Sequence, residues 1–74
     1  MDVLTKDNIN PDHYKFGGIE TIDYIKAKLT AEQFEGYLIG NLIKYTSRYR
    51  NKNGLEDLHK AEWYLCRLIK EIQK

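Results

Sequence analysis

The spacing of apolar residues after residue 18 predicts three helices. Over Ile19–Leu29 the apolar positions recur every three or four residues, which is typical of one face of a short first helix. The next segment, TAEQ at residues 30–33, has the form of a capping box, in which the side chains of Thr30 and Gln33 each bond the other residue's backbone amide. We therefore expect the second helix to begin at Thr30.

The second helix is apolar around much of its circumference. Its main stripe consists of Phe34, Leu38, Leu42, Tyr45 and Tyr49. Ile39 and Ile43 form a second apolar patch, and Gly36 and Gly40 lie on a third side, where small residues let another backbone approach closely. A helix of this kind is usually central in its fold or covered by a partner chain, so the pattern favours a homo-oligomer.

A third helix is expected over about Leu55–Gln73, after a turn formed by residues 51–54. Its predicted apolar face consists of Leu58, Ala61, Leu65, Leu68 and Ile72, with Leu55 and Ile69 beside it. A contrasting polar stripe at the same spacing consists of Asp57, Lys60, Tyr64, Arg67 and Glu71. Because the turn is short, helices two and three are expected to form an antiparallel hairpin.

Length and composition narrow the fold and function classes. The chain of 74 residues predicts a single all-α domain over residues 1–74, with an extended N-terminal arm at residues 10–16 and flexible residues 1–9. Its net charge of +1 is too balanced for a DNA-coating protein, and we expect no sequence-specific nucleic-acid partner. Its one cysteine excludes a disulfide framework, and no apolar run is long enough for a membrane span. No signal peptide is recognisable, so a cytoplasmic location is expected.

The strongest chemical feature is a basic stretch at residues 40–54 that contains four cations and no carboxylate. Asn41, Lys44 and Arg48 line one edge of the second helix, with Tyr45 beside them. Cations on a rigid helix beside amide and phenol donors suit a phosphate group, and aromatic faces suit a nucleobase. The alternative from spacing alone is a solvated basic face with tyrosines in the core.

The third helix offers a partner surface for this edge. Lys60 and Tyr64 could face it across the hairpin, although an ion pair between Lys60 and Asp57 is an equal alternative. In the N-terminal arm, His13 and Tyr14 are further candidates for ligand contact, because a histidine can donate to a phosphate; a lone histidine in a loop is more often a hydrogen-bonded anchor.

Catalytic and metal-binding motifs are weak. Glu20 and Asp23 lie one turn apart and could hold Mg²⁺ through nucleotide phosphates, but complementation of the helix dipole is the favoured interpretation. Ser47 lacks the histidine and carboxylate that a nucleophile needs, and no P-loop is present. We therefore predict no metal, no cofactor and no catalytic residue.

Several blocks of the chain, in order, resemble the SaV-like family of small phage proteins. These blocks are NPDHY (10–14), GIETIDYI (18–25), GNLIKYTSR (40–48), KNGLEDL (52–58) and KAEWYL (60–65). The family includes a longer phage nucleotide kinase that lacks a P-loop, so the resemblance implies a phage origin and a nucleotide-type ligand. The matching polar positions are His13, Tyr14, Glu20, Asp23, Asn41, Lys44, Arg48, Asp57 and Lys60.

Three functions remain open from the sequence. The favoured hypothesis is a non-catalytic protein that sequesters a nucleotide immune signal, of the cyclic oligonucleotide type, in the cytoplasm of the infected bacterial host. The second is a kinase of nucleoside monophosphates, and the third is a module that binds a host protein. The predicted ligand-binding residues are His13, Tyr14, Asn41, Lys44, Tyr45, Arg48, Lys60 and Tyr64.

Overall fold

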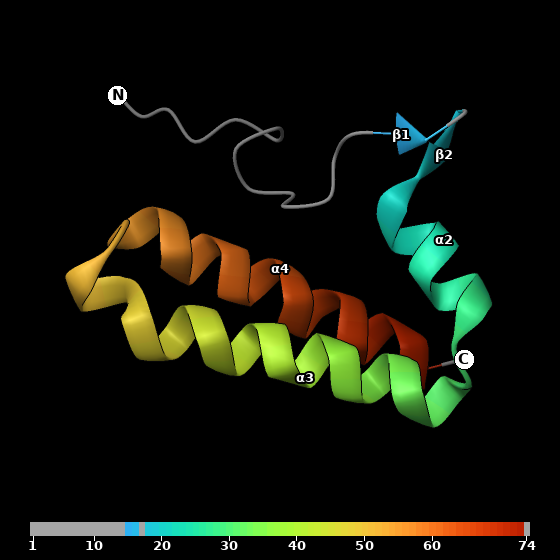
Figure 1. The fold of residues 1–74 in the computed structure, drawn as a ribbon. Coiled ribbons are helices and arrows are strands. Elements are labelled where there is room, and N and C mark those ends of the chain that lie inside the picture. Colours follow the sequence, from blue (N-terminus) through green and yellow to red (C-terminus); the bar gives the residue numbers. More distant parts are fainter. Residues whose placement is uncertain (1–14, 17, 74) are drawn as a thin grey trace.

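Three helices and a small hairpin of strands make up the described part of the chain, which is residues 15–16 and 18–73 of the computed structural model (Figure 1). In chain order the elements are β1 (Lys15–Phe16), β2 (Ile19–Glu20), α2 (Thr21–Lys28), α3 (Ala31–Arg48), the 3-10 turn η1 (Tyr49–Asn51) and α4 (Leu55–Ile72). The mainly helical fold and its three helices agree with the prediction from sequence. Residues 1–9, predicted to be flexible, and most of the predicted arm at residues 10–16 lie outside the described residues.

The first helix begins later than predicted. β1 and β2 pair antiparallel, with Lys15 opposite Glu20 and Phe16 opposite Ile19. Gly18 has a φ of 86°, a conformation that favours glycine, and it reverses the chain between the two strands. Ile19 and Glu20 are therefore strand residues, and the helix starts at Thr21.

The second helix begins at the predicted capping box. The Thr30 hydroxyl accepts a hydrogen bond from the Gln33 amide at 3.1 Å, and the Gln33 side-chain oxygen accepts one from the Thr30 amide at 2.9 Å. These two bonds satisfy amide groups that the helix itself leaves without a partner. α3 then continues for 18 residues.

α3 and α4 lie side by side as an antiparallel hairpin (Figure 1), as predicted. The reversal uses Gly54, whose φ of 59° is a second conformation that favours glycine, and whose amide donates to the Tyr49 carbonyl at 2.8 Å. The buried core is shared by all three helices and consists of Ile22, Phe34, Leu38, Tyr45, Ala61 and Tyr64. The predicted main stripe of α3 therefore supplies half of the core.

α4 turns a different side to the core than its leucines predict. Asp57 is fully buried and Tyr64 is 2% exposed, whereas Leu58 is 37% and Leu65 is 41% exposed. The polar stripe thus faces the other helices, because Asp57 pairs with Arg48 of α3 while Arg67 and Glu71 pair with residues of α2. Of the predicted apolar face, Ala61 is buried and Leu68 packs against the core.

The other sides of α3 remain uncovered in the described structure. Ile39 and Ile43 are 42% and 59% exposed. A β-carbon added at Gly36 or Gly40 would meet no atom within 4 Å, so no described segment makes the close backbone approach expected there. Oligomerisation stays a prediction. Within residues 18–73, no helix combines the length and apolarity needed to cross a bilayer.

Candidate functional site

Three cations converge on the ring of Tyr45. The amino groups of Lys44 and Lys60 lie 4.7 and 5.5 Å from the ring centroid, and the guanidinium carbon of Arg48 lies 4.8 Å from it. Lys44 and Arg48 come from α3 and Lys60 comes from α4, so the cluster joins both helices of the hairpin. All three distances are within the range of favourable cation–π contact. We call these four residues the Tyr45 cluster.

The Tyr45 ring is held rigidly by other aromatic rings. It stacks on Tyr64 with a centroid distance of 5.9 Å and an angle of 13° between the planes. Tyr64 in turn meets Trp63 edge-on at 5.0 Å and Tyr37 edge-on at 6.3 Å. Tyr45 is 7% exposed and Tyr64 only 2% exposed. The cations are therefore positioned over a fixed support.

The buried carboxylate of Asp57 holds Arg48. Its two oxygens accept hydrogen bonds from the Arg48 Nε and Nη2 atoms at 3.2 and 3.3 Å. They also accept bonds from the backbone and side-chain nitrogens of Asn53 at 3.1 and 3.3 Å. Burial on its own would raise the pKa of Asp57, but the bonds from Arg48 and Asn53 outweigh it and hold the pKa below its ordinary value.

Among the described residues, positive charge in the Tyr45 cluster exceeds the negative charge that pairs with it. Asp57 neutralises Arg48, whereas neither Lys44 nor Lys60 forms an ion pair with a carboxylate of the described residues. The alternative of an ion pair between Lys60 and Asp57 is therefore wrong, because Arg48 and Asn53 occupy that carboxylate. Two ammonium groups near one ring, without a carboxylate partner among the described residues, are a suitable binding site for a polyanion such as a phosphate.

The structure brings together most of the predicted ligand-binding residues. Lys44, Tyr45, Arg48, Lys60 and Tyr64 form one continuous group. Asn41 stands apart in its bonding, because its side-chain nitrogen donates to the Tyr37 carbonyl at 3.0 Å on its own helix. His13 and Tyr14 lie outside the described residues. Ligand binding by all eight residues stays a prediction.

Sequence reasoning missed the role of Asn53. The turn that contains Asn53 was expected, but its contacts with Asp57 were not. A signal for them exists, because Asp57 is the third residue of α4 and an acidic side chain there can reach back to the amides that precede a helix.

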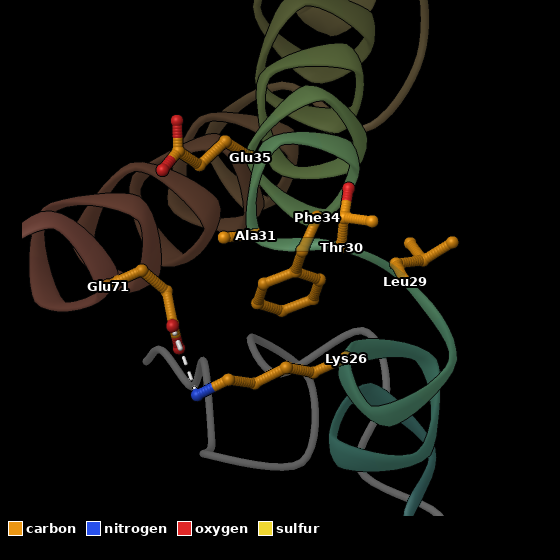
Figure 2. A pocket seen from close by; sticks show the side chains of 7 residues that line it. All are labelled: Lys26, Leu29, Thr30, Ala31, Phe34, Glu35 and Glu71. Atoms are coloured by element: carbon orange, nitrogen blue, oxygen red, sulfur yellow. Dashed lines mark ion pairs between the residues drawn. The ribbon is translucent and has the colours of Figure 1, made fainter.

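A pocket lies at the opposite end of the hairpin from the Tyr45 cluster, where α2 meets α3 and α4. This pocket has a volume of about 270 Å³ and is lined by Lys26, Leu29, Thr30, Ala31, Phe34, Glu35 and Glu71. Figure 2 shows the Lys26 side chain reaching from α2 toward Glu71, and their ion pair measures 3.0 Å. Glu71 also accepts a bond from Arg67 at 3.0 Å, so the charges of Lys26 and Glu71 are already paired.

Metal binding finds no support in the described residues. Asp23, one member of the acidic pair considered for Mg²⁺, instead pairs with Arg67 at 3.2 Å. Within residues 18–73, no group of three or more histidine, cysteine, aspartate or glutamate side chains is arranged to hold a metal ion.

Comparison with known proteins places these residues in a family. Residues 9–66, which include the whole Tyr45 cluster, match the model of a family described as a protein of unknown function, DUF3310. The chain belongs to the DUF3310 family. The more specific resemblance to the SaV-like family stays a prediction.

Two phage proteins are similar to this DUF3310 chain. The chain is 44% identical over 59 residues to "Nucleotide kinase gp1.7" of Escherichia phage T7, and 40% identical over 66 residues to "Gene 1.7 protein" of Enterobacteria phage T3. These alignments cover 73% and 82% of this chain but only 30% and 40% of the two relatives. No solved structure matches.

Proposed function

We propose that this DUF3310 protein binds the phosphate of a nucleotide at the Tyr45 cluster. The observation that carries the proposal is the convergence of three cations on one buried ring, where Asp57 is the one carboxylate of the described residues that pairs with any of them. Like charges held close together repel one another, and a bound phosphate relieves that repulsion while accepting hydrogen bonds from the lysines.

The tyrosines of the cluster support the cations more than they line a pocket. Because Tyr45 and Tyr64 are 7% and 2% exposed, little of either ring is open to a nucleobase. In our proposal Lys44 and Lys60 contact the phosphate, and the two stacked rings hold them in place.

Sequestration without chemistry is the form of binding that this geometry favours. Phosphoryl transfer needs a group that orients or deprotonates the nucleophile and a way to hold Mg²⁺. The carboxylate that touches the cluster, Asp57, is buried and occupied by Arg48 and Asn53. It is therefore not available for either role. A protein with this site would hold its nucleotide, of cyclic oligonucleotide or related type, and release it unchanged.

Nucleotide kinase activity is the second candidate. It is supported by the name of the phage T7 relative, a nucleotide kinase, and by the resemblance found in the sequence. The aligned segment spans less than half of each relative, so the activity of those whole proteins comes to this chain as a proposal only.

Calorimetric titration of the full chain with nucleoside monophosphates and cyclic dinucleotides tests the binding site. Lys44→Gln and Lys60→Gln should each raise the dissociation constant about 10-fold or more, the scale for hydrogen bonds to charged groups. Lys28→Gln is the matched control, because the Lys28 amino group also lies 5.5 Å from a tyrosine ring, that of Tyr24, outside the cluster. Arg48 is not substituted, since its loss would also release Asp57. Unchanged affinity in both cluster variants would show that the cluster is only a solvated basic face.

Product analysis separates the two candidate functions. The chain is incubated with ATP, Mg²⁺ and labelled monophosphate, then heat-denatured, and the nucleotides are resolved by thin-layer chromatography. Intact ligand in stoichiometric amount supports sequestration, whereas labelled diphosphate that accumulates over many turnovers establishes the kinase. Turnover lost in Lys44→Gln but kept in Lys28→Gln would assign the chemistry to the cluster.

A further inference from the structure

The side of α4 that faces away from the core carries a row of exposed apolar side chains. Their exposed fractions lie between 37% and 63%. The row consists of Leu55, Leu58, Leu65, Ile69 and Ile72. These residues span all 18 residues of α4, or about 27 Å of helix. No described segment of the chain covers them.

The spacing of this row is that of a coiled-coil seam. Together with Glu62, the positions alternate in steps of three and four residues from Leu55 to Ile72, which is the a and d pattern of a heptad repeat. Such a seam is narrow and packs against one other helix. α3 is not that helix, because it packs against the side of α4 that bears Asp57, Ala61 and Tyr64.

We propose that the occupant of this seam is the seam of a second copy of the chain, packed antiparallel. The steps of the seam, three-four-three-four-three, are the same in both directions. An antiparallel pair centred between residues 63 and 64 therefore sets Leu55 against Ile72 of the partner subunit. In the same register Leu58 meets Ile69 of the partner subunit, and Glu62 meets Leu65 of the partner subunit. The seam is thus complementary to itself over its full length.

Glu62 is the one charged residue of the seam, and its replacement can change the stability of the dimer. Its carboxylate bonds the Nδ1 atom of His59 on its own helix at 3.1 Å, and its side chain is 66% exposed. In the proposed dimer, Glu62 interrupts two central layers that leucine would fill. A polar residue at such a position costs stability while it fixes register.

The proposed dimer leaves both Tyr45 clusters free. Lys60 is two residues from Leu58, and a step of two residues on an α-helix turns the side chain by about 200°. The cluster and the seam therefore lie on different sides of α4. Dimerisation is for this reason independent of the proposed nucleotide binding.

Sedimentation equilibrium of the full chain, from low to high micromolar concentration, tests the proposal. We expect a reversible equilibrium between monomer and dimer. Leu65→Glu should raise its dissociation constant about 100-fold or more, because it buries a further charge in a central layer. Glu62→Leu should lower the dissociation constant about 10-fold or more, a gain that misfolding cannot produce. Ile43→Glu is the matched control, since Ile43 is 59% exposed on α3 and lies outside the seam.

The outcomes decide the proposal in either direction. A dimer weakened by Leu65→Glu, strengthened by Glu62→Leu and unaffected by Ile43→Glu supports it. A chain that stays monomeric throughout overturns it. A dimer that responds to Ile43→Glu and not to the seam variants also overturns it, because the interface would then lie on α3.

Discussion

Replacing Asp57 by asparagine tests how much the buried carboxylate stabilises the turn between α3 and α4. Asparagine has nearly the same shape, but it has one acceptor oxygen in place of two. In either orientation its amide nitrogen faces one donor of Arg48 and one of Asn53. The substitution therefore removes two of the four hydrogen bonds and sets donor against donor.

The magnitude follows from these contacts. A hydrogen bond to a charged group contributes about 1.5–3 kcal/mol and a neutral one about 1 kcal/mol. The Arg48 side chain is 34% exposed, so water recovers part of its loss. We expect Asp57→Asn to lower the free energy of unfolding by about 2–3 kcal/mol, a large share of the roughly 4–11 kcal/mol that a chain of this length has.

Urea denaturation followed by circular dichroism, at one protein concentration and at neutral pH, measures this loss. The matched control is Asp23→Asn, because the Asp23 side chain is 56% exposed and makes a single 3.2 Å contact with Arg67. We expect that control to cost about 0.5 kcal/mol or less, the scale of an exposed ion pair. Equal losses in the two variants would refute the argument that burial and the shared bonds of Arg48 and Asn53 make Asp57 important.

Three further predictions concern stability. The difference in free energy of unfolding between the natural chain and Asp57→Asn should be constant near neutral pH and shrink as the pH falls below about 4. The reason is that a carboxylate whose pKa is lowered by folding stabilises the fold only while ionised. Denaturant titrations at several pH values check this, and a constant difference down to pH 2 would contradict it. Thr30→Ala should cost about 1 kcal/mol by removing one arm of the capping box, measurable as a lower urea midpoint against Thr46→Ala, which lies in the last turn of the same helix, far from the cap. Gly36→Ala should raise the unfolding free energy by about 0.5–1 kcal/mol, since the added methyl group meets nothing within 4 Å; a loss of stability would reveal an approach by another segment or subunit.

The elements themselves were predictable because their signals are local. The capping box at Thr30 and the glycine turn at Gly54 depend on residues within one helical turn, and both appear where the sequence placed them. The start of the first helix was misplaced because β2 depends on a partner strand, β1, that the apolar spacing of Ile19 does not reveal.

The orientation of α4 was not predictable from its own pattern. Its leucines make a stronger apolar stripe than the side with Asp57 and Tyr64, yet that polar side is buried. The decisive partners, Arg48 and Tyr45, lie on α3, and only their positions in space reveal the pairing. The α3 part of the Tyr45 cluster was easier to predict, because residues 40–54 form one basic stretch of the sequence without a carboxylate.

The contacts that hold α2 determine which part of the fold unfolds first. α2 contributes one buried side chain, Ile22, and one partly buried side chain, Ile25, to the core, and the pairs of Lys26 with Glu71 and of Asp23 with Arg67 tie it to α4. Salt weakens the more exposed of these ties, whereas the rest of the hairpin core depends on apolar burial. We therefore expect the backbone amides of α2 to exchange hydrogen with solvent earlier than those of α3 and α4, and to do so faster as ionic strength rises. The chain would then have two cooperative units of different stability, with ionic strength controlling the weaker one.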